Sequence, residues 1–143
     1  MTTTVKFKLL SESAKKPTKA HNEDAGFDIY SAQAGTVEPK GWLDFRTDVA
    51  MQPPAGYYGK FASKSGLAMK YDIHSFHGTV DNNYRGGMVV RLFNYSEKPF
   101  RVEIGDKITQ LVLIPYFVGT GEIVEELDDT ERGENGFGST GRK

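Results

Sequence analysis

The sequence predicts an all-β domain of the sandwich, barrel or jelly-roll type. Short apolar or alternating runs, which are typical of strands, recur along the chain. They lie at residues 5–9, 27–30, 42–45, 57–61, 88–93, 100–104, 108–117 and 122–127. No segment sustains a helical period, and residues 65–71 would form at most two turns of helix.

Each predicted strand is bounded by residues that favour turns. The first strand alternates Val5, Phe7 and Leu9 with lysines, which is the period of a half-buried strand. Residues 11–24, rich in Lys, Ser, Asn and Asp, are expected to form an extended surface connection. The later strands are separated by turn signals at residues 34–35, 39–41, 53–56, 82–83, 94–96 and 119–121.

Length and composition indicate one soluble domain. The 143 residues are 38% hydrophobic and 26% charged, with no room for two full domains. We expect the domain to span residues 1–127 and a flexible C-terminal arm to span residues 128–143. The net charge of −1 gives no electrostatic footprint for a nucleic-acid polymer or a membrane surface.

Two further absences narrow the function. The lack of cysteine excludes disulfides, thiolate metal sites and a thiol nucleophile. The chain begins without an apolar signal segment, and no run is long enough to span a bilayer. We therefore expect an intracellular, cytoplasmic protein, in the host cytoplasm if the source is a virus.

Two glycine-containing segments place charged side chains beside predicted strands. In residues 24–31, Asp28 points away from the face that carries Phe27 and Ile29. Alone, it would be a solvated strand-edge carboxylate. In residues 63–70, Lys64 and serine hydroxyls precede a glycine and form a workable anion cradle, although an ordinary capped turn has the same composition.

The segment GTVDNNYRGG, residues 78–87, contains more candidate functional residues than the two segments above. Two strands joined through residues 81–83 would form a tight hairpin or turn, with Asp81 at its mouth and Tyr84 close by. A carboxylate fixed there could take a proton from water while the aromatic ring packs against a sugar. An Asx-turn aspartate that caps its own loop is the alternative.

Gln110 interrupts the most apolar strand of the chain, in the segment IGDKITQLV. A buried amide without a partner costs about 1–3 kcal/mol. We therefore expect the Gln110 side chain to bond either neighbouring backbone, the more common arrangement, or a ligand.

The C-terminal segment RGENGFGSTG, residues 132–141, contains four glycines in ten residues. Such a segment stays loose until a partner orders it. Phe137 could then stack on a nucleobase, and Arg132, Ser139 and Thr140 could donate to phosphate. A frayed terminus explains the same composition equally well.

The five segments in this order resemble the five motifs of the trimeric dUTP pyrophosphatases (dUTPases), over essentially the whole chain. The matching blocks are AGFDIYS, SKSGLAMK, GTVDNNYRG, GDKITQLV and RGENGFGSTG. The resemblance implies a jelly-roll-like (β-clip) subunit, and a homotrimer with shared active sites. It also implies Mg²⁺-dependent hydrolysis of dUTP to dUMP and pyrophosphate. This activity would limit uracil in DNA and supply dUMP for dTMP synthesis.

The resemblance also implies roles for single residues. Asp81 would activate the attacking water, and Gln110 would touch the α-phosphate or position that water. Asp28 would hold the water shell of Mg²⁺. Tyr84 would pack on the deoxyribose, and residues 76–80 would offer backbone groups to uracil. The substrate-binding residues implied are Lys64, Ser65, Gly66, Gly78, Val80, Tyr84, Arg132, Phe137, Gly138, Ser139 and Thr140.

Two residues depart from the family pattern. Lys64 stands where the family usually has arginine, and lysine offers a point charge in place of a bidentate fork. Gly87 stands where an acidic or amide residue is common. The nearby His74 and His77 are not expected to bind metal, because their spacing does not give a shared ligand face.

Three other functions are compatible with a fold of this class. A dCTP deaminase of the same superfamily needs a glutamate acting on the base, and residues 39–91 contain none. A nucleotide-controlled regulatory protein would need a partner that the sequence does not encode visibly. A structural jelly-roll module, such as a capsid subunit, leaves Asp81, Tyr84 and Phe137 without a role.

Overall fold

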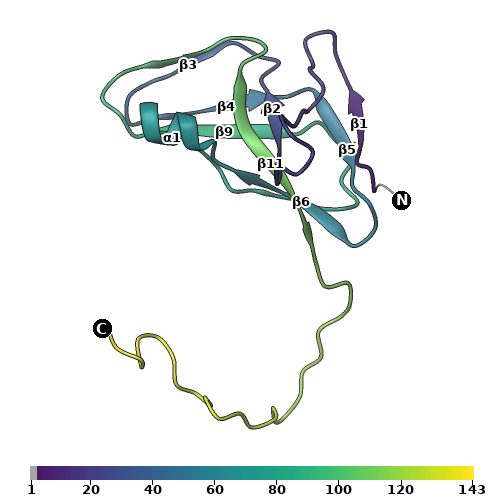
Figure 1. Ribbon diagram of the computed structural model, residues 1–143, viewed down its shortest axis with the longest axis vertical. Coiled ribbons are helices and arrows are strands. Elements are labelled where there is room, and N and C mark those ends of the chain that lie inside the picture. The colour runs from purple at the N-terminus through teal and green to yellow at the C-terminus, as the bar shows by residue number, and fades with distance from the viewer. Residues whose placement is uncertain (1–2) are drawn as a thin grey trace.

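The chain folds as an all-β, jelly-roll-like domain followed by an extended arm (Figure 1), as the sequence predicts. The computed structural model describes residues 3–143. Within them it has eleven strands and one helix. The elements are β1 (Lys6–Leu9), β2 (Gly26–Tyr30), β3 (Gly35–Val37), β4 (Trp42–Arg46), β5 (Val49–Gln52), β6 (Tyr57–Ala62), α1 (Ser65–Tyr71), β7 (Ile73–Ser75), β8 (Thr79–Val80), β9 (Val89–Asn94), β10 (Phe100–Val102) and β11 (Lys107–Pro115).

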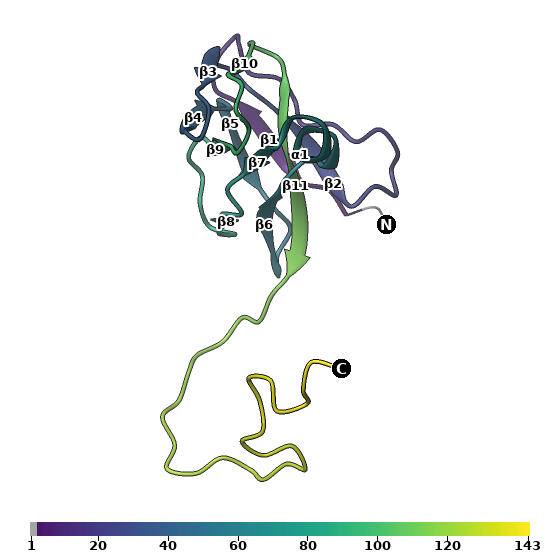
Figure 2. The ribbon, with the colours of Figure 1, turned by 90° about the vertical axis from the view of Figure 1, so that its left-hand side faces the viewer.

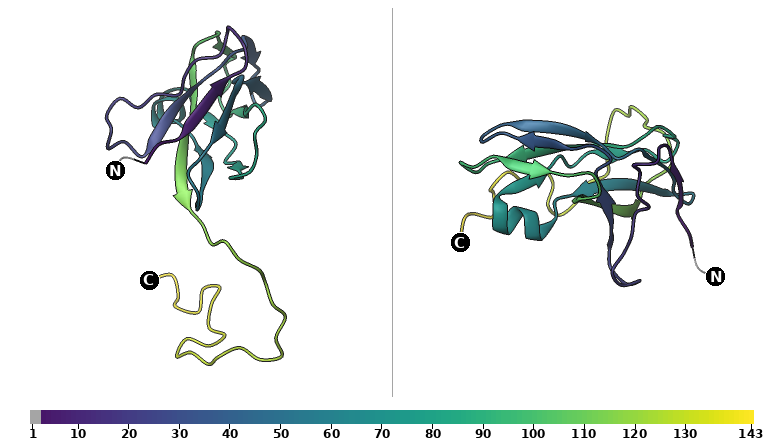
Figure 3. Two further views of the ribbon diagram at one scale, coloured as in Figure 1. Left: turned by 90° about the vertical axis from the view of Figure 1, so that its right-hand side faces the viewer. Right: turned by 90° about the horizontal axis from the view of Figure 1, so that it is seen from above.

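Strand β11 organises the domain. It lies in the largest sheet, of order β2-β11-β6-β8, and runs antiparallel to both β2 and β6. A second sheet has the order β4-β9-β7, and two strand pairs, β1-β5 and β10-β3, complete the body. Figure 2 shows β11 running the length of the body and leading into the arm. The view from above in Figure 3 shows the strands arranged in layers.

The core lies between the sheets and follows the two-residue alternation of the strands. In β9, Val90, Leu92 and Asn94 are buried while the residues between them are partly or fully exposed. Asn94 tolerates burial because its amide donates to the carbonyl oxygens of Val37 (2.9 Å) and Lys98 (2.7 Å). Each large apolar side chain buried here stabilises the fold by about 1.5–3 kcal/mol. The largest fully buried apolar residues are Phe45, Ile29, Ile73, Leu92, Ile108 and Leu111.

The helix α1 has two turns, as predicted, and its last residue is Tyr71. The next residue, Asp72, caps the helix with a φ of 57°, which lies in the left-handed region. The Asp72 N–H donates to the carbonyl oxygen of Ala68 at 3.1 Å. Lys64 occupies the N-cap position without a side-chain cap bond. None of the helical residues in the described part of the chain forms a segment long and apolar enough to cross a bilayer.

Three short strands were not predicted from the sequence. Strands β3, β5 and β7 have three or four residues each, too few to show a period. The prediction for residues 81–83 was a tight hairpin or a turn. The hairpin alternative is wrong, because β8 pairs with β6 whereas β9 pairs with β4 and β7. A turn does form there, closed by a bond from the Tyr84 N–H to the Asp81 carbonyl oxygen at 3.1 Å.

The predicted strand at residues 122–127 is absent. Strand β11 ends at Pro115, and the chain then leaves the body as an extended segment (Figure 1). A strand forms only against a partner edge, and no strand of the described chain pairs with this segment. The proposed division between residues 1–127 and 128–143 stays a prediction, and residues 1–2 lie outside the described residues.

Candidate active site

One half of the candidate site is a polar row across the largest sheet. Strand pairing places Asp28 of β2 opposite Gln110 of β11, and Gln110 opposite Ala62 of β6. Opposite residues in an antiparallel sheet share a face, so the Asp28 and Gln110 side chains point the same way. Gln110 is half-buried, and within residues 3–143 its amide makes no hydrogen bond to protein. The amide is therefore available to a ligand or to water.

Asp28 is held between two lysines and is not a solvated edge carboxylate. Its Oδ1 lies 2.5 Å from Lys64 Nζ, and its Oδ2 lies 3.1 Å from Lys107 Nζ. The Asp28 side chain is 13% exposed, and burial opposes its ionisation. The hydrogen bonds and charges of the two lysines outweigh that burial and hold the pKa of Asp28 below its ordinary value. The same contact raises the pKa of Lys107.

The lowered pKa of Asp28 gives a testable pH dependence. A carboxyl with a folded pKa below its unfolded value stabilises the protein above the unfolded pKa, and that stability is lost as the pH falls. We expect Asp28→Asn to lower the free energy of unfolding at pH 7 by about 1 kcal/mol, because Lys107 is half-exposed and solvent screens its pair. Urea unfolding at several pH values measures this difference, which should shrink in acid. A difference that is constant with pH would contradict the ion-pair role.

Hydrogen bonds of three hydroxyl side chains connect the loop that carries Lys64 to the body. Ser63 Oγ accepts a bond from the Ser75 N–H at 3.0 Å. Ser75 Oγ lies 2.7 Å from Thr109 Oγ1, which donates to the Ala62 carbonyl oxygen at 2.9 Å. Ser65 and Gly66, at the start of α1, are exposed. The structure thus fixes the backbone beside Lys64 and leaves the predicted phosphate-binding residues accessible.

The other half of the candidate site is a cavity of about 300 Å³ beside the β8–β9 connection. Asp81 and Tyr84 lie at its wall, as do Gly78 and Val80. Its remaining lining residues are Phe61, Phe76, Thr79, Gly87, Met88 and Val89. A volume of this order is at the small end of known ligand sites, and apolar walls with few polar groups are typical of such sites.

The geometry of the turn positions Asp81 and Tyr84 at the cavity. The Asn82 amide donates to the carbonyl oxygens of Pro54 (3.0 Å) and Tyr57 (2.8 Å), which fixes the loop to the start of β6. The Tyr84 hydroxyl donates to the Gly87 carbonyl oxygen at 3.1 Å. A Cβ at Gly86 would lie 2.3 Å from the Tyr84 hydroxyl oxygen, so a larger residue there would displace the Tyr84 side chain from this position. The Asp81 carboxylate is exposed and free of protein hydrogen bonds among the described residues.

The two halves are not brought together within one chain. On β6, Gly59 pairs with Val80 of the cavity wall and Ala62 pairs with Gln110. These two positions are three residues apart, which corresponds to about 10 Å along the strand. The cavity lining contains neither Asp28 nor Gln110. One subunit therefore presents the cavity and the polar row of Asp28 and Gln110, with the lysines that contact Asp28, as separate surfaces.

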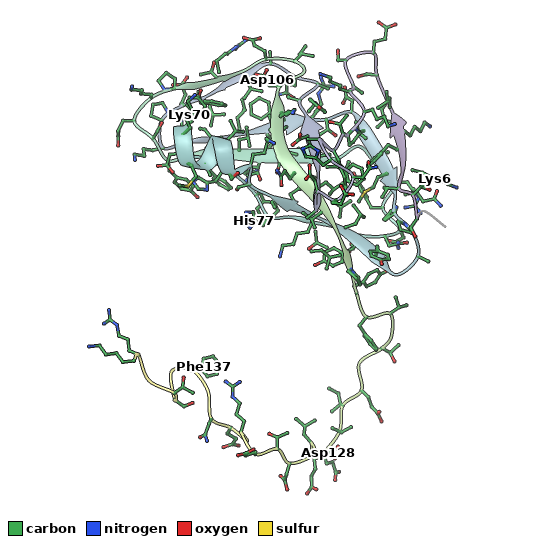
Figure 4. All side chains as sticks on the ribbon, in the orientation of Figure 1. Lys6, Lys70, His77, Asp106, Asp128 and Phe137 are labelled. Carbon is green, nitrogen blue, oxygen red and sulfur yellow. The ribbon has the colours of Figure 1, made fainter. Side chains whose placement is uncertain are left out.

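The arm reaches neither half in this structure. Figure 4 shows Asp128 and Phe137 on the arm, apart from His77 on the body. The arm makes local turns only, such as the bond from the Ser139 N–H to the Gly136 carbonyl oxygen at 3.1 Å. Phe137 is completely exposed, with a φ of 50°. Arg132, Gly138, Ser139 and Thr140 are exposed with it.

Neither nearby histidine enters a metal cluster. His74 Nε2 lies 3.0 Å from Asp72 Oδ1, and His77 Nε2 lies 3.4 Å from Ser63 Oγ. Across residues 3–143 no three His, Cys, Asp or Glu side chains are grouped so as to hold a metal ion.

Sequence reasoning missed two side chains of the site. Lys107 belongs to a quoted motif, but its contact with Asp28 follows from the pairing of β2 and β11, which the sequence does not specify. The Phe76 side chain was overlooked because only backbone groups were expected to act in residues 76–80. The signal in the sequence is an aromatic residue two positions before Gly78, at the edge of a quoted motif.

A jelly-roll body with a small cavity beside a free carboxylate, two lysines and a glycine-rich arm has the groups that an enzyme acting on a nucleotide would use. The dUTPase family model matches residues 12–141. The chain belongs to the dUTPase family.

Individual relatives agree with this membership. The deoxyuridine 5'-triphosphate nucleotidohydrolase of Candida albicans is 47% identical over 99% of this chain and 90% of its own length. That of Kluyveromyces lactis is 42% identical over 99% of this chain and 97% of its own length. The dUTPase of Staphylococcus bacteriophage 80alpha, solved with dUPNHPP, has a TM-score of 0.91 and 33% identity, and covers 99% of this chain and 100% of that one.

A further solved structure concerns metal. A mutant dUTPase from phage phi11 of S. aureus, described with a structural Mg(II) ion, has a TM-score of 0.82 and 29% identity. It covers 88% of this chain and 99% of that one.

Proposed function

We propose that the protein hydrolyses dUTP to dUMP and pyrophosphate. The observation that carries this proposal is the cavity that places the free Asp81 carboxylate and the Tyr84 ring at one wall. The size of the cavity suits a pyrimidine nucleoside. Family membership and the dUPNHPP-bound relative support the same substrate class.

Base and sugar would be recognised by shape and by backbone groups. Residues 78–80 line the cavity, and those of their backbone groups that are not paired with β6 would bind the uracil edge. The Tyr84 ring, fixed over Gly86, would pack on the deoxyribose and leave no room for a ribose 2′-hydroxyl. A site built around uracil hydrogen bonds rejects cytosine more sharply than a steric wall rejects a methyl group.

The chemical step would use Asp81 as general base. Its carboxylate takes a proton from a water molecule, and the oxygen of that water attacks the α-phosphorus of dUTP. The bond between the α-phosphorus and the bridging oxygen breaks, and pyrophosphate leaves. Gln110, whose amide is free, would touch the α-phosphate or orient the water.

Lys64, Ser65 and Gly66 would bind phosphate oxygens. Asp28 holds the Lys64 ammonium group in place. In the arm, Arg132, Ser139 and Thr140 would bind the γ-phosphate. Phe137 and Gly138 would cover the uracil ring and exclude water from the reacting atoms.

A homotrimer would complete the site. The cavity and the polar row of Asp28 and Gln110 are separate on one subunit, and the arm extends away from the body. The segment between β11 and the arm also exposes large apolar side chains, with Phe117 82%, Ile123 100% and Leu127 86% exposed. Side chains of this kind are buried when an arm lies on another subunit. Each active site would thus combine surfaces from different copies of the chain.

The residues present suit a magnesium ion that arrives with the substrate. The described residues offer no cluster of protein ligands, and Mg²⁺ is often bound mainly through substrate phosphates and water. Asp28 is ionised at neutral pH, and each of its oxygens keeps a lone pair beyond its lysine contact. Because the two lysines leave a net positive charge there, Asp28 would accept a bond from a metal-bound water only together with the negative charge of the substrate phosphates. When bound, such an ion supplies neutralisation of phosphate charge. The phi11 relative supports a role for Mg²⁺ in the family.

A substrate panel tests the proposal. With Mg²⁺ present, we expect pyrophosphate and dUMP from dUTP. Rates should be at least about 100-fold lower with dCTP, whose base edge is mismatched, and about 100-fold lower with UTP, whose 2′-hydroxyl meets the Tyr84 ring. Absence of pyrophosphate from all four of dUTP, dCTP, dTTP and UTP would reject the proposal. Ammonia release from dCTP would indicate a deaminase instead.

Three wider roles follow from this activity as proposals. Hydrolysis of dUTP would limit uracil incorporation into DNA and supply dUMP for dTMP synthesis. Cytoplasmic location stays a prediction. A regulatory protein partner that responds to the ordering of the arm stays a hypothesis, which a pull-down with and without a non-hydrolysable dUTP analogue can test.

A further inference from the structure

Phe76 is an aromatic side chain at the cavity wall that the proposed mechanism does not use. It follows β7, and its N–H donates to the Arg91 carbonyl oxygen at 2.9 Å, which fixes the backbone. The residue is 57% exposed although it lines the same cavity as Asp81 and Tyr84. An exposed aromatic ring on a fixed backbone is available to contact a flat ligand.

Gly78 determines where the Phe76 ring lies. A Cβ at position 78 would be 2.9 Å from Phe76 Cε1 and 3.0 Å from Cδ1, so the ring lies directly over the glycine backbone. Behind this backbone lies Phe61, whose N–H donates to the Gly78 carbonyl oxygen at 3.2 Å. The ring is thus supported on one side, and its exposed part borders the cavity.

We propose that Phe76 is a base-binding residue that contacts the uracil ring from the body, separately from Phe137 of the arm. The inference rests on the proposed function, because it names a contact within the same cavity. Residues 78–80 offer polar backbone groups to the edge of the base, but they offer no aromatic surface to its face. Phe76 supplies that surface before the arm closes, and Phe137 supplies a second one afterwards.

The nearest alternative is that Phe76 only supports the loop. Backbone bonds already hold this loop at Phe76, Gly78 and Val80, through Arg91, Phe61 and Gly59 respectively. The half-exposed ring adds little buried area to that support. A residue that only supports the loop would affect all ligands of the cavity equally, whereas a base contact affects only ligands that carry a base.

The test compares two ligands on the full-length protein by calorimetry. We expect Phe76→Ala to weaken binding of dUMP about tenfold, as loss of an aromatic contact to a base does. Binding of deoxyribose 5-phosphate, which lacks the base, should stay unchanged. Phe76→Tyr should retain wild-type affinity for dUMP. Met69→Ala, which truncates an 88% exposed side chain on α1, is the control and should change neither affinity.

The outcomes separate the inference from the proposed function. An unchanged dUMP affinity in Phe76→Ala, or an equal loss for both ligands, would overturn the role of Phe76 while wild-type dUTP hydrolysis stands. Wild-type protein that neither binds dUMP nor hydrolyses dUTP would overturn the proposed function itself. In the double variant Phe76→Ala with Phe137→Ala, a further loss of dUTP affinity beyond either single variant would support two separate contacts. No further loss would contradict them.

Discussion

Asp81→Asn is expected to lower the turnover number for dUTP by about 10²–10⁴-fold, the range typical of losing a general base. The amide has nearly the same shape as the carboxylate but cannot accept the proton of the attacking water. The Asp81 carboxylate is exposed and makes no hydrogen bond to other described residues. Folding stability and dUMP affinity should therefore stay close to wild type. Steady-state kinetics with a pyrophosphate assay, together with thermal unfolding, measure both expectations.

Asp106→Asn is the matched control for this substitution. Asp106 is an exposed aspartate in a turn, where its Oδ2 accepts a bond from the Glu103 N–H at 2.8 Å, and asparagine can keep that bond. The control should retain full turnover. Parental turnover in Asp81→Asn would show that another group activates the water.

Removal of residues 131–143 is expected to reduce kcat/KM for dUTP by at least about 100-fold. The truncation deletes Arg132, Ser139 and Thr140, and each charge-assisted bond to phosphate contributes about 1.5–3 kcal/mol. It also deletes Phe137, the proposed cover of the base. Because the arm makes no bond to the body in this structure, the melting temperature should change little. Kinetics and thermal unfolding of the truncated chain provide the measurement.

Phe137→Ala separates the contribution of the Phe137 ring to dUTP hydrolysis from that of the other arm residues. We expect a loss of about tenfold, since stacking on a base is only one of the arm contacts. Wild-type kinetics in both the truncated chain and Phe137→Ala would mean that the arm is a frayed terminus without a role in the reaction.

Local patterns predicted much of the body. The alternation in residues 5–9 and 88–93 identified β1 and β9, because a strand with one buried face repeats every two residues. The same rule placed the Asp28 side chain opposite its apolar neighbours. The glycine content of residues 132–141 identified a segment that does not pack on its own body.

The sequence alone did not predict which distant segments pair as strands. The hairpin through Asp81 was wrong because turn residues specify a reversal but not which strands then pair. The contact of Lys107 with Asp28 depends on the register of β11 against β2, and that register includes a bulge. The predicted strand at 122–127 has a suitable pattern, yet no partner edge exists within the chain.

The exposed arm has a consequence for the end of each catalytic cycle. Ordering the backbone costs about 1–2 kcal/mol per residue, so only a ligand with many simultaneous contacts can hold the arm closed. Intact dUTP would join the base contact at Phe137 to the γ-phosphate contact at Arg132 within one molecule. Cleavage separates these two ends, and neither product can offset the entropy alone. Cleavage would thereby remove the ligand that holds the arm closed, and the arm would open to release the products without a further signal.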